Sequence, residues 1–475
     1  MNTPGGGGTR SAGDRIAPQE LVPRLAAVLR PDQIDVSASG RELHGRGESW
    51  DDVRLPDVVV YPESTEDVRR VMVLAHATRT PVTPVAVNSS LGGHTVPVDG
   101  GISLDLGRMD RILEIAGEDF LAIVQPAVTY PRLNQALKAT GLFFPVDPGA
   151  EASLGGMAST NASGTLAVRY GVTRDHIRGL EVVTPTGQVI RTGGRAPKSS
   201  SGYSLTQLFC GAEGTLGVIT ELTVRLVPRP EAAVGARVAF GDIPSAVGYV
   251  TELIQAGMPV ARCELVDGAG LRAIREHLGL TLPETPTVFL EFHGEPATAR
   301  SACENAVALA REHGSPVADM ATDPAALEAL WRARHQAYNA AVAVHPGLTN
   351  VITDVAVPVS RLAEVIETAL ASIERVGVAS ILIGHAGDGN FHLVLFFPPN
   401  DADARRRVEE AYDELVRAAL AAGGTCTGEH GVGLRKLPYV RAEHGAAVDV
   451  MWAIKDALDP AGIMNPGKKL PQRTC

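Results

Sequence analysis

The chain has 475 residues, of which 45% are hydrophobic and 20% charged, and its formal net charge is −11. This length exceeds what a single hydrophobic core supports and predicts two or three domains, while the negative charge argues against a nucleic-acid-binding surface. The cysteines form no CxxC pair and are odd in number, so we expect free thiols in a reducing compartment. They are Cys210, Cys263, Cys303, Cys426 and Cys475.

The N-terminal segment is rich in glycine and polar residues and lacks the apolar run of a secretory signal. We therefore expect roughly the first dozen residues to be disordered. A transmembrane helix needs about 18 or more consecutive apolar residues, and the sequence contains no such run, so no membrane span is predicted. A cytoplasmic location is expected, and peripheral attachment to the inner face of the membrane is left open.

The first half of the chain is interpreted as an α+β domain over residues 51–230, preceded by a lead-in over 1–50. Its first elements are strand, helix and strand, the pattern of a βαβ unit, and Ser64 or Thr65 opens the helix. Short apolar runs broken by Gly and Pro then predict more strands. The expected helices cover 18–32 and 64–79, and the expected strands cover 57–62, 82–87, 102–106, 120–128, 179–194 and 217–228.

Residues 231–425 are expected to form a second domain, in which helices cover one face of an antiparallel sheet. A C-terminal segment over 426–475 follows and contains a helix at 446–458 that ends before Pro460. The expected helices of the second domain cover 244–257, 299–314, 324–344, 361–377 and 401–422, and its expected strands cover 231–240, 287–294, 350–359, 380–386 and 391–397.

Two histidines lie in the predicted β-hairpin near the end of the second domain. Asp388-Gly389 is a strong signal for a two-residue turn, and such a turn places His385 directly opposite His392, with Cβ atoms about 4.5–5.5 Å apart. Two imidazoles in this position can bind one metal ion, with a carboxylate from elsewhere as the third ligand. A packed and hydrogen-bonded histidine pair is the alternative interpretation.

A glycine-rich loop with the sequence GTCTGEHGVG follows the helix at 401–422 and places Glu429 next to His430. Loops on rigid scaffolds often contain functional residues, and an adjacent acid and base suit proton transfer. An exposed Glu-His pair in an ordinary turn explains the same pattern equally well.

Three runs of small residues predict loops whose backbone N–H groups can approach an anionic ligand such as a pyrophosphate. They cover residues 87–101, 145–165 and 209–220, and the third contains Glu213 among glycines. None matches the GxGxxG fingerprint after a first strand, so a Rossmann-type nicotinamide site is not indicated.

Seven motifs, in order between residues 50 and 470, give the chain a specific resemblance to the FAD-linked oxidases of the vanillyl-alcohol oxidase superfamily. Within it, the chain is similar to the D-lactate dehydrogenase (cytochrome) and glycolate oxidase flavoprotein group. The resemblance implies an α+β fold: a two-subdomain PCMH-type FAD-binding domain, completed by the returning C-terminal segment, plus a cap domain with an antiparallel sheet covered by helices. The motifs cover 148–194, 211–228, 330–341, 353–362, 384–392, 424–433 and 458–468.

The resemblance implies FAD, and the matching motif positions place its contacts in the small-residue runs and the C-terminal segment. His94 falls several residues too late to match the histidine of covalent flavoproteins, so noncovalent FAD is expected. The implied contacts are Asn88, Ser89, Ser90, Leu91, Gly93, Pro148, Gly149, Ser153, Gly156, Asn161, Ser163, Gly164, Glu213, Ile219 and Asn465.

The sequence of the first loop differs from that of the corresponding loop in similar proteins. Many of them carry Arg-Gly-x-Gly-Thr, where this chain has residues 85–89 with the sequence VAVNS. Alanine and valine resist the positive φ angles that glycine adopts, so the loop is expected to differ in its backbone.

The resemblance also implies a divalent metal ion bound by His385, His392 and Glu429. Nitrogen and oxygen ligands leave Zn²⁺, Mn²⁺ and Fe²⁺ open. His430 matches the proposed general base of similar enzymes, and Arg334 matches an arginine that binds the substrate carboxylate.

These features together imply FAD-dependent, metal-assisted oxidation of a small D-2-hydroxy acid, D-lactate before others, to the 2-oxo acid. Relatives that oxidise 2-hydroxyglutarate tend to have a lysine where this chain has Ile352, two residues before Asp354, so a second carboxylate would lack a partner. The alternatives are a glycolate or D-2-hydroxyglutarate dehydrogenase, a phenolic-alcohol oxidase of the same superfamily, a zinc hydrolase without flavin, and a noncatalytic flavoprotein subunit. The electron acceptor and an oligomeric state are left open.

Overall fold

The structure is a computed structural model that describes residues 15–47 and 52–473. The expected disorder of the first dozen residues and the expected free thiol of Cys475 concern positions outside the described residues. The other four cysteines are buried and free, as the scattered cysteine pattern predicts. Within the described ranges, no helix is both long and apolar enough to cross a membrane.

The predicted FAD-binding domain begins with a four-stranded sheet in the order β1-β2-β4-β3. Strands β2, β4 and β3 are parallel, and α3 connects β2 to β3, as the βαβ pattern predicts. Ser64 caps α3 by accepting a hydrogen bond from the N–H of Asp67. Apolar side chains of α1 and α3 pack on this sheet. The elements are α1 (Pro18–Ala26), β1 (Ile34–Asp35), α2 (Ala38–Leu43), β2 (Val58–Val60), α3 (Thr65–Thr78), β3 (Val82–Val85) and β4 (Ile102–Asp105).

A five-stranded antiparallel sheet in the order β5-β6-β10-β8-β9 forms the second subdomain. Its core is built with side chains from α4, α5 and α8. The elements are β5 (Ile112–Ala116), β6 (Leu121–Val124), α4 (Tyr130–Ala136), α5 (Leu154–Thr160), α6 (Ala167–Tyr170), α7 (Thr173–His176), β8 (Ile177–Val183), β9 (Val189–Gly193), α8 (Leu205–Phe209) and β10 (Val218–Arg225). Strand β7 (Leu142–Phe143) pairs with β11 (Val227–Pro228), and β11 directly precedes the cap domain in the chain.

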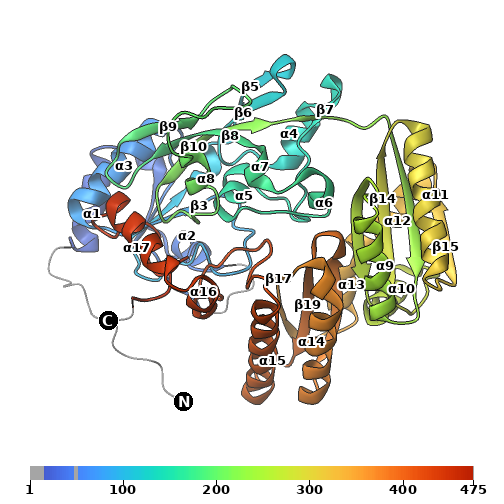
Figure 1. Ribbon diagram of the computed structural model, residues 1–475. Helices are drawn as coiled ribbons and strands as arrows, with labels where there is room; N and C mark the ends of the chain where they lie inside the picture. The colour runs from blue at the N-terminus through green and yellow to red at the C-terminus, as the bar shows by residue number, and fades with distance from the viewer. Residues whose placement is uncertain (1–14, 48–51, 474–475) are drawn as a thin grey trace.

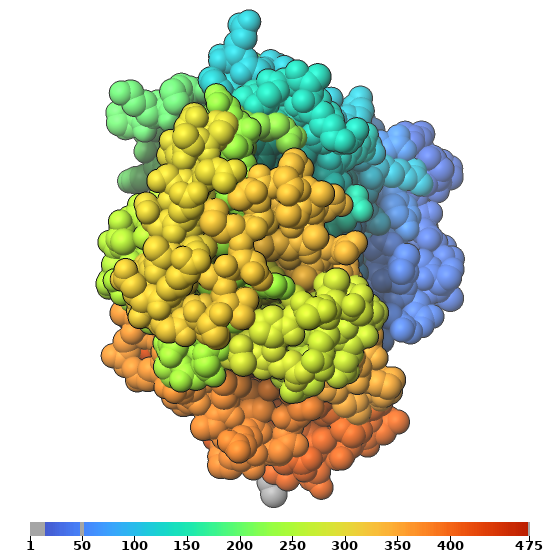
Figure 2. Space-filling view, turned by 90° about the vertical axis from the view of Figure 1, so that its right-hand side faces the viewer, coloured from blue at the N-terminus to red at the C-terminus, as the bar shows by residue number. Residues whose placement is uncertain are grey.

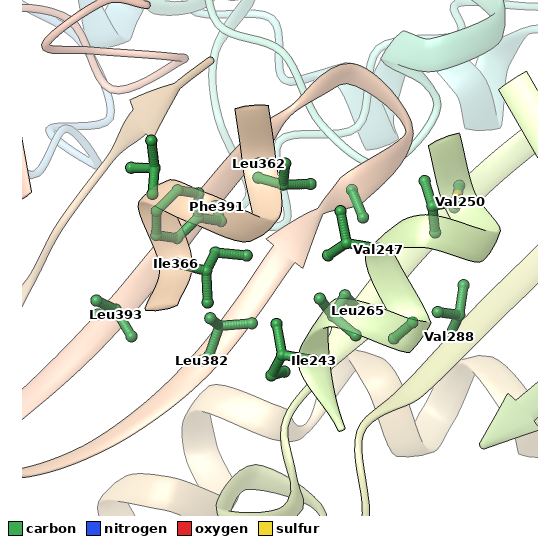
Figure 3. Packing of buried hydrophobic residues seen from close by; sticks show 14 of the residues in the cluster. Ile243, Val247, Val250, Leu265, Val288, Leu362, Ile366, Leu382, Phe391 and Leu393 are labelled. Atoms are coloured by element: carbon green, nitrogen blue, oxygen red, sulfur yellow. The ribbon is translucent and has the colours of Figure 1, made fainter. Parts of the chain in front are cut away.

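The cap domain contains an antiparallel sheet in the order β15-β12-β14-β13-β18-β19-β16, with β17 also paired to β19. Figure 3 shows Ile243, Val247 and Val250 packing near Leu265 and Leu382 in the core between this sheet and its helices. The strands are β12 (Ala232–Ala239), β13 (Val260–Val266), β14 (Thr287–Gly294), β15 (Val317–Ala321), β16 (Thr349–Ile352), β17 (Val355–Ala356), β18 (Ala379–His385) and β19 (Asn390–Phe397).

Helices α9, α11, α14 and α15 bury one face of the cap sheet. The sequence predicts helices on one face only, whereas the helix expected over 324–344 packs on the opposite face. Helices α10, α12 and α13 cover part of the other face, and α10, β13 and β15 are elements that the sequence analysis did not predict. The helix predicted over 324–344 is divided into α12 and α13 at Gln336. The helices are α9 (Ile243–Gln255), α10 (Gly268–Leu278), α11 (Pro296–Glu312), α12 (Pro324–His335), α13 (Ala337–Ala343), α14 (Leu362–Val376) and α15 (Ala402–Ala421).

The C-terminal segment lies against the first domain, as α16 and α17 show in Figure 1. Ile454 and Leu458 of α17 pack on the second subdomain, whereas Ile463 and Met464 pack in the core of the first sheet. In Figure 2 the yellow and orange residues of the cap domain form most of the visible face, with blue N-terminal residues beside them. The helices of this segment are α16 (Leu437–His444) and α17 (Ala447–Leu458).

Candidate active site

The hairpin has a different register from the one that the sequence predicts. His385 pairs with Asn390, and His392 pairs with Ile383, so the two histidines are not directly opposite. The prediction of a two-residue turn is wrong because residues 386–388 form a 3₁₀ turn and Gly389 adopts φ 78°, which makes a four-residue loop. A register shift of two residues keeps every side chain on its face. The two imidazoles therefore still meet, diagonally, with ring centroids 5.5 Å apart.

The two histidines and Glu429 converge. Nε2 of His385 lies 3.3 Å from Oε1 of Glu429, and Nε2 of His392 lies 3.1 Å from the same oxygen. On the other edge of each ring, Nδ1 of His385 lies 2.7 Å from a Glu264 carboxylate oxygen and Nδ1 of His392 lies 2.9 Å from the carbonyl oxygen of Thr353. If both Nδ1–H groups donate to these acceptors, both Nε2 lone pairs remain available near Glu429.

The electrostatics of this trio suit a cation. Burial alone would lower the pKa of His385, but Glu264 and Glu429 raise it well above its usual value. Burial alone would raise the pKa of Glu429, yet His385 and His392 hold it well below its usual value. Buried carboxylates therefore attract positive charge at the point where the three side chains meet. The ligand atoms of His385, His392 and Glu429 all lie within 4.8 Å of one another.

Asp354 holds the loop that presents Glu429 and His430. Its carboxylate accepts hydrogen bonds from the backbone N–H groups of Gly428, Glu429 and His430, at 3.0, 3.2 and 3.0 Å. It also accepts a hydrogen bond from Nζ of Lys436 at 3.0 Å. Burial would raise the pKa of Asp354, but Lys436 and the neighbouring histidines hold it well below its usual value. Asp354, His392 and His430 form a second group that could hold a metal ion. The Asp354 oxygens already accept the hydrogen bonds from the loop and from Lys436, so the group with Glu429 is the better candidate.

His430 lies beside the trio. Its ring stacks on that of His392, with centroids 4.9 Å apart and an interplanar angle of 16°, and its Nε2 lies 3.7 Å from Oε1 of Glu429. Burial lowers the pKa of His430 to about 4. A neutral imidazole is the form of histidine that accepts a proton, so the residue suits the role of a base at neutral pH.

Arg334 lies in the last turn of α12 and is buried. It forms an ion pair with Glu264, whereas its Nε has no hydrogen-bond partner within the described residues. Burial alone would raise the pKa of Glu264, but His385 and Arg334 lower it to about 2. Sequence reasoning missed Glu264 because it missed strand β13; the alternation of charged and apolar residues over 261–265 was the available signal.

A cavity of about 930 Å³ lies between the cap sheet and the FAD-binding domain. Arg334, His385, His392, Glu429 and His430 line it, so the predicted catalytic and metal-binding residues share one space. We call it the second cavity. Ile352, Ile383 and Val394 also line its wall on the cap sheet, and they provide an apolar surface next to the two histidines.

The three small-residue loops and the C-terminal segment surround another cavity, called the first cavity here. Glu429 and His430 line both cavities, so the two spaces meet at these side chains. The predicted FAD contacts that line the first cavity are Asn88, Ser89, Ser90, Leu91, Pro148, Ser153, Gly156, Glu213, Ile219 and Asn465.

The other predicted FAD contacts have different surroundings. Gly149 lines the second cavity. Asn161 ends α5 with φ 56°, and its Oδ1 accepts a hydrogen bond from the N–H of Arg174, so its side chain has a local structural partner. Ser163 donates a hydrogen bond to Oε2 of Glu429 at 2.9 Å, which connects it to the predicted metal ligands. Gly93 and Gly164 are not among the residues that line either cavity.

The loop over 85–89 tolerates the loss of the glycines found in relatives. Asn88 is its one residue with a positive φ, at 61°, and asparagine enters the left-handed region more readily than most residues. Ala86 and Val87 stay outside that region, so the expected backbone conflict does not arise there.

The walls of the first cavity fit a polar ligand. Both ring nitrogens of His94 are buried and, among the residues described, form no hydrogen bond, although Nε2 lies 3.4 Å from Oε2 of Glu213. Buried polar atoms are normally satisfied, so a polar group in this cavity would complete them. Asn465 donates hydrogen bonds to the carbonyl oxygens of His94 and Glu213, at 3.0 and 2.8 Å, and connects the C-terminal segment to two of the loops.

The chain matches two protein families that together cover most of its length. Residues 56–193 match the family described as FAD binding domain, and residues 229–469 match the family described as FAD linked oxidases, C-terminal domain. The first cavity is formed largely by loops within the first match, whereas His385, His392 and Glu429 lie within the second. FAD is therefore the cofactor of this protein.

Two relatives cover nearly the whole chain. It is 41% identical to the probable mitochondrial D-lactate dehydrogenase of Danio rerio over 469 residues, which covers 98% of this chain and 94% of that protein. It is 34% identical to the glycolate oxidase subunit GlcD of Bacillus subtilis (strain 168) over 455 residues, covering 95% and 96%.

Among solved structures, p-cresol methylhydroxylase with bound substrate superimposes with a TM-score of 0.79. The match covers 95% of this chain and 96% of that chain at 18% sequence identity. At this identity the likeness shows the fold alone, and it confirms the α+β, PCMH-type architecture that the sequence predicts.

Proposed function

The chain belongs to the FAD-linked oxidases, and from this premise we propose that it oxidises a small D-2-hydroxy acid, D-lactate before others, to the 2-oxo acid. The observation that supports this function most directly is the junction of the two cavities at Glu429 and His430, beside His385 and His392. A flavin in the first cavity and an acid in the second would then be neighbours. The relative from Danio rerio, named as a probable D-lactate dehydrogenase, supports D-lactate as the substrate.

The proposed cofactors have residues suited to hold them. The loops of the first cavity and Asn465 would bind FAD noncovalently, and His385, His392 and Glu429 would bind a divalent ion. Two nitrogen ligands and one oxygen ligand suit Zn²⁺, Mn²⁺ or Fe²⁺ and leave coordination positions open. When bound, FAD supplies the hydride acceptor and the metal ion supplies a Lewis acid.

Arg334 would bind and orient the substrate carboxylate. It is buried, lines the second cavity, and has an Nε without a partner in the described part of the chain. Arginine can bind a carboxylate through two parallel hydrogen bonds, which fixes the acid in one orientation. That orientation determines which enantiomer presents its C2 hydrogen to the flavin.

His430 would accept the proton of the substrate hydroxyl. Its low pKa keeps the imidazole unprotonated at neutral pH, and its position on both cavities places it between substrate and cofactor. The C2 hydrogen leaves with its electron pair and the hydroxyl hydrogen leaves as a proton, so the products are the 2-oxo acid and the two-electron-reduced cofactor.

The wall of the second cavity favours a monocarboxylic acid. Ile352, Ile383 and Val394 offer no charge to a second carboxylate. Arg262 and Arg229 line the cavity as well, but Arg262 already pairs with Asp147 and Glu291, and Arg229 donates a hydrogen bond to the carbonyl oxygen of Leu142. This arrangement favours D-lactate or a similar aliphatic acid over D-2-hydroxyglutarate.

Glycolate is a second candidate substrate, because the chain is 34% identical to the glycolate oxidase subunit GlcD over nearly its full length. The apolar wall next to the histidines favours the methyl group of lactate over the bare carbon of glycolate. A comparison of kcat/KM for the two acids separates these candidates.

Anaerobic flavin reduction tests the proposal. The purified holoenzyme is mixed with D-lactate, L-lactate, glycolate and D-2-hydroxyglutarate, and the loss of flavin absorbance is followed before and after treatment with a chelator. We expect fast bleaching by D-lactate, slow bleaching by L-lactate, and loss of the D-lactate reaction after chelation with recovery on adding the metal. Equal rates for both lactate enantiomers, or full activity without metal, would contradict it. Acid denaturation should release the yellow cofactor from the chain.

A further inference from the structure

Glu264 connects the two halves of the proposed site. It lies on β13 and its side chain is fully buried. Oε1 accepts a hydrogen bond from Nδ1 of His385 at 2.7 Å, and Oε2 accepts one from Nη2 of Arg334. One carboxylate therefore contacts both a proposed metal ligand and the proposed substrate clamp, with a separate oxygen for each.

We propose that Glu264 is a positioning residue that couples metal binding at His385 to carboxylate binding at Arg334. The inference rests on the proposed function, because it assumes that these two side chains hold a metal ion and a substrate. Glu264 itself lies among the residues behind them and does not line either cavity, so it acts through its two partners.

On the metal side, Glu264 sets the state of the His385 ring. An Nδ1–H that donates to a carboxylate leaves Nε2 as the lone-pair nitrogen and makes it a stronger ligand. His392 has only a neutral partner at Nδ1, the carbonyl oxygen of Thr353. The charged partner therefore distinguishes His385 within the trio. The sheet fixes this contact, since Leu265 pairs with Gly384 and so places Glu264 beside His385.

On the substrate side, Glu264 holds the Arg334 guanidinium in the cavity wall. A buried arginine without a counter-ion is strongly unfavourable, and the pairing uses Nη2 while Nε stays without a partner in the described residues. A guanidinium has five N–H donors, so donors remain for a substrate carboxylate. Movement of Glu264 would displace the clamp and the metal ligand together.

The two contacts require a carboxylate. Both partners are donors, whereas a glutamine offers one acceptor oxygen and one NH₂ group. Glu264→Gln must therefore turn an NH₂ group toward either His385 or Arg334 and lose at least one bond as well as the charge. Glu264→Asp keeps the charge but is one methylene shorter, so it cannot keep both contacts at their present lengths.

Glu291 provides a matched control. It lies on the neighbouring strand β14, is buried, and pairs with a histidine and an arginine, His293 and Arg262. Neither partner belongs to the metal-binding trio or to the clamp. Because both partners line the second cavity, Glu291→Gln serves as the control for the Mn²⁺ titration and for FAD content: it removes a buried charge from the same sheet without touching the metal-binding trio.

The experiment compares the wild type with Glu264→Gln, Glu264→Asp and Glu291→Gln, all as FAD-containing protein. Flavin absorbance and FAD content report on the fold, titration of chelated protein with Mn²⁺ gives the metal affinity, and steady-state assays at saturating Mn²⁺ give KM for D-lactate. Loss of an outer-sphere partner typically weakens metal binding about 10–100-fold. We expect that loss and a KM raised by about 10-fold or more for Glu264→Gln with normal FAD content, and wild-type Mn²⁺ affinity and FAD content for Glu291→Gln.

The outcomes separate the inference from the function on which it rests. Wild-type metal affinity or wild-type KM in Glu264→Gln would overturn the coupling while the proposed function stands. If Glu264→Gln does not fold, Glu264→Asp decides: a change in Mn²⁺ affinity or KM supports the coupling, and wild-type values for both overturn it. A wild-type protein that binds no Mn²⁺, Zn²⁺ or Fe²⁺ would overturn the metal site itself, and the coupling with it.

Discussion

The ammonium group of Lys436 lies 3.0 Å from Oδ2 of Asp354 and 2.5 Å from the carbonyl oxygen of the same residue, and both side chains are buried. The Asp354 carboxylate in turn accepts hydrogen bonds from the backbone N–H groups of residues 428–430. The pair therefore anchors the loop that presents Glu429 and His430, although neither Asp354 nor Lys436 lines a cavity.

Replacement of Lys436 by methionine should destabilise the protein strongly. The substitution keeps much of the side-chain volume but leaves the Asp354 carboxylate buried without a counter-ion, which costs about 3–5 kcal/mol. Urea unfolding followed by protein fluorescence measures the free energy of unfolding. Arg417→Met is the control, because its ion pair with Asp413 is exposed and should contribute nothing measurable. Equal unfolding midpoints for the two variants would contradict the role of Lys436.

Glu429→Gln should lose the divalent ion and keep the flavin. The substitution removes the only carboxylate of the trio, whereas the loops of the first cavity remain intact. Metal analysis after dialysis and the flavin spectrum measure the two effects. Ser163→Ala removes one hydrogen bond to Glu429 and should weaken metal binding less, by about 10-fold. Unchanged metal content in Glu429→Gln would show that the ion binds elsewhere.

His430→Ala should bind metal and FAD but reduce the flavin slowly. The variant loses the proposed base, and a positioned base contributes about 10²–10⁴-fold to the rate. Anaerobic stopped-flow reduction by D-lactate measures this step alone. His313→Ala is the control, since His313 lies at the end of α11 and pairs with Glu252 at the surface. Normal bleaching by His430→Ala would mean that another group accepts the proton.

The stability of the cap domain should depend on the ionisation of Asp267, the N-cap of α10. Burial raises the pKa of Asp267 from 3.8 to about 6. Because the folded pKa lies above the unfolded one, the folded state binds more protons between these values, and stability falls as the pH rises from about 4 to 6. The pKa shift of about two units corresponds to a loss of about 3 kcal/mol in the free energy of unfolding over this pH range.

Asp267→Asn can keep the cap hydrogen bond to the N–H of Gly270 without the charge. The stability of this variant relative to the wild type should therefore increase as the pH rises from 4 to 7. Denaturant unfolding at several pH values measures the difference. Asp242→Asn, at the exposed N-cap of α9, should show no such increase. A difference that stays constant with pH would contradict the raised pKa of the Asp267 carboxyl.

The sequence predicts the fold class and most of the site because the necessary signals are local. The βαβ unit, the hairpin and the glycine-rich loops all follow from residues close together in the chain. The register of the hairpin was predicted incorrectly, since the Asp-Gly signal does not distinguish a two-residue turn from the four-residue loop that Gly389 closes. The prediction that His385 and His392 lie on the same face is correct despite this error, because the predicted loop and the observed loop both have an even number of residues.

The supporting residues could not be predicted in the same way. Glu264 contacts residues 70 and 121 positions away in the chain, and neither separation corresponds to a local pattern. Asp354 was visible only as part of a family motif, and its function depends on the path of a loop more than 70 residues later. Strand β13 did leave a signal, since Arg262 and Glu264 alternate with Cys263 and Leu265, but the charged members obscured it.

The position of Asn465 has a consequence for how the protein is made. This residue comes after the whole cap domain in the sequence, yet its amide closes the wall between the His94 and Glu213 loops. During translation, the FAD-binding loops emerge from the ribosome several hundred residues earlier than the side chain that joins them. We therefore expect FAD to bind late in synthesis or after it, and a chain that ends before residue 465 should bind FAD poorly.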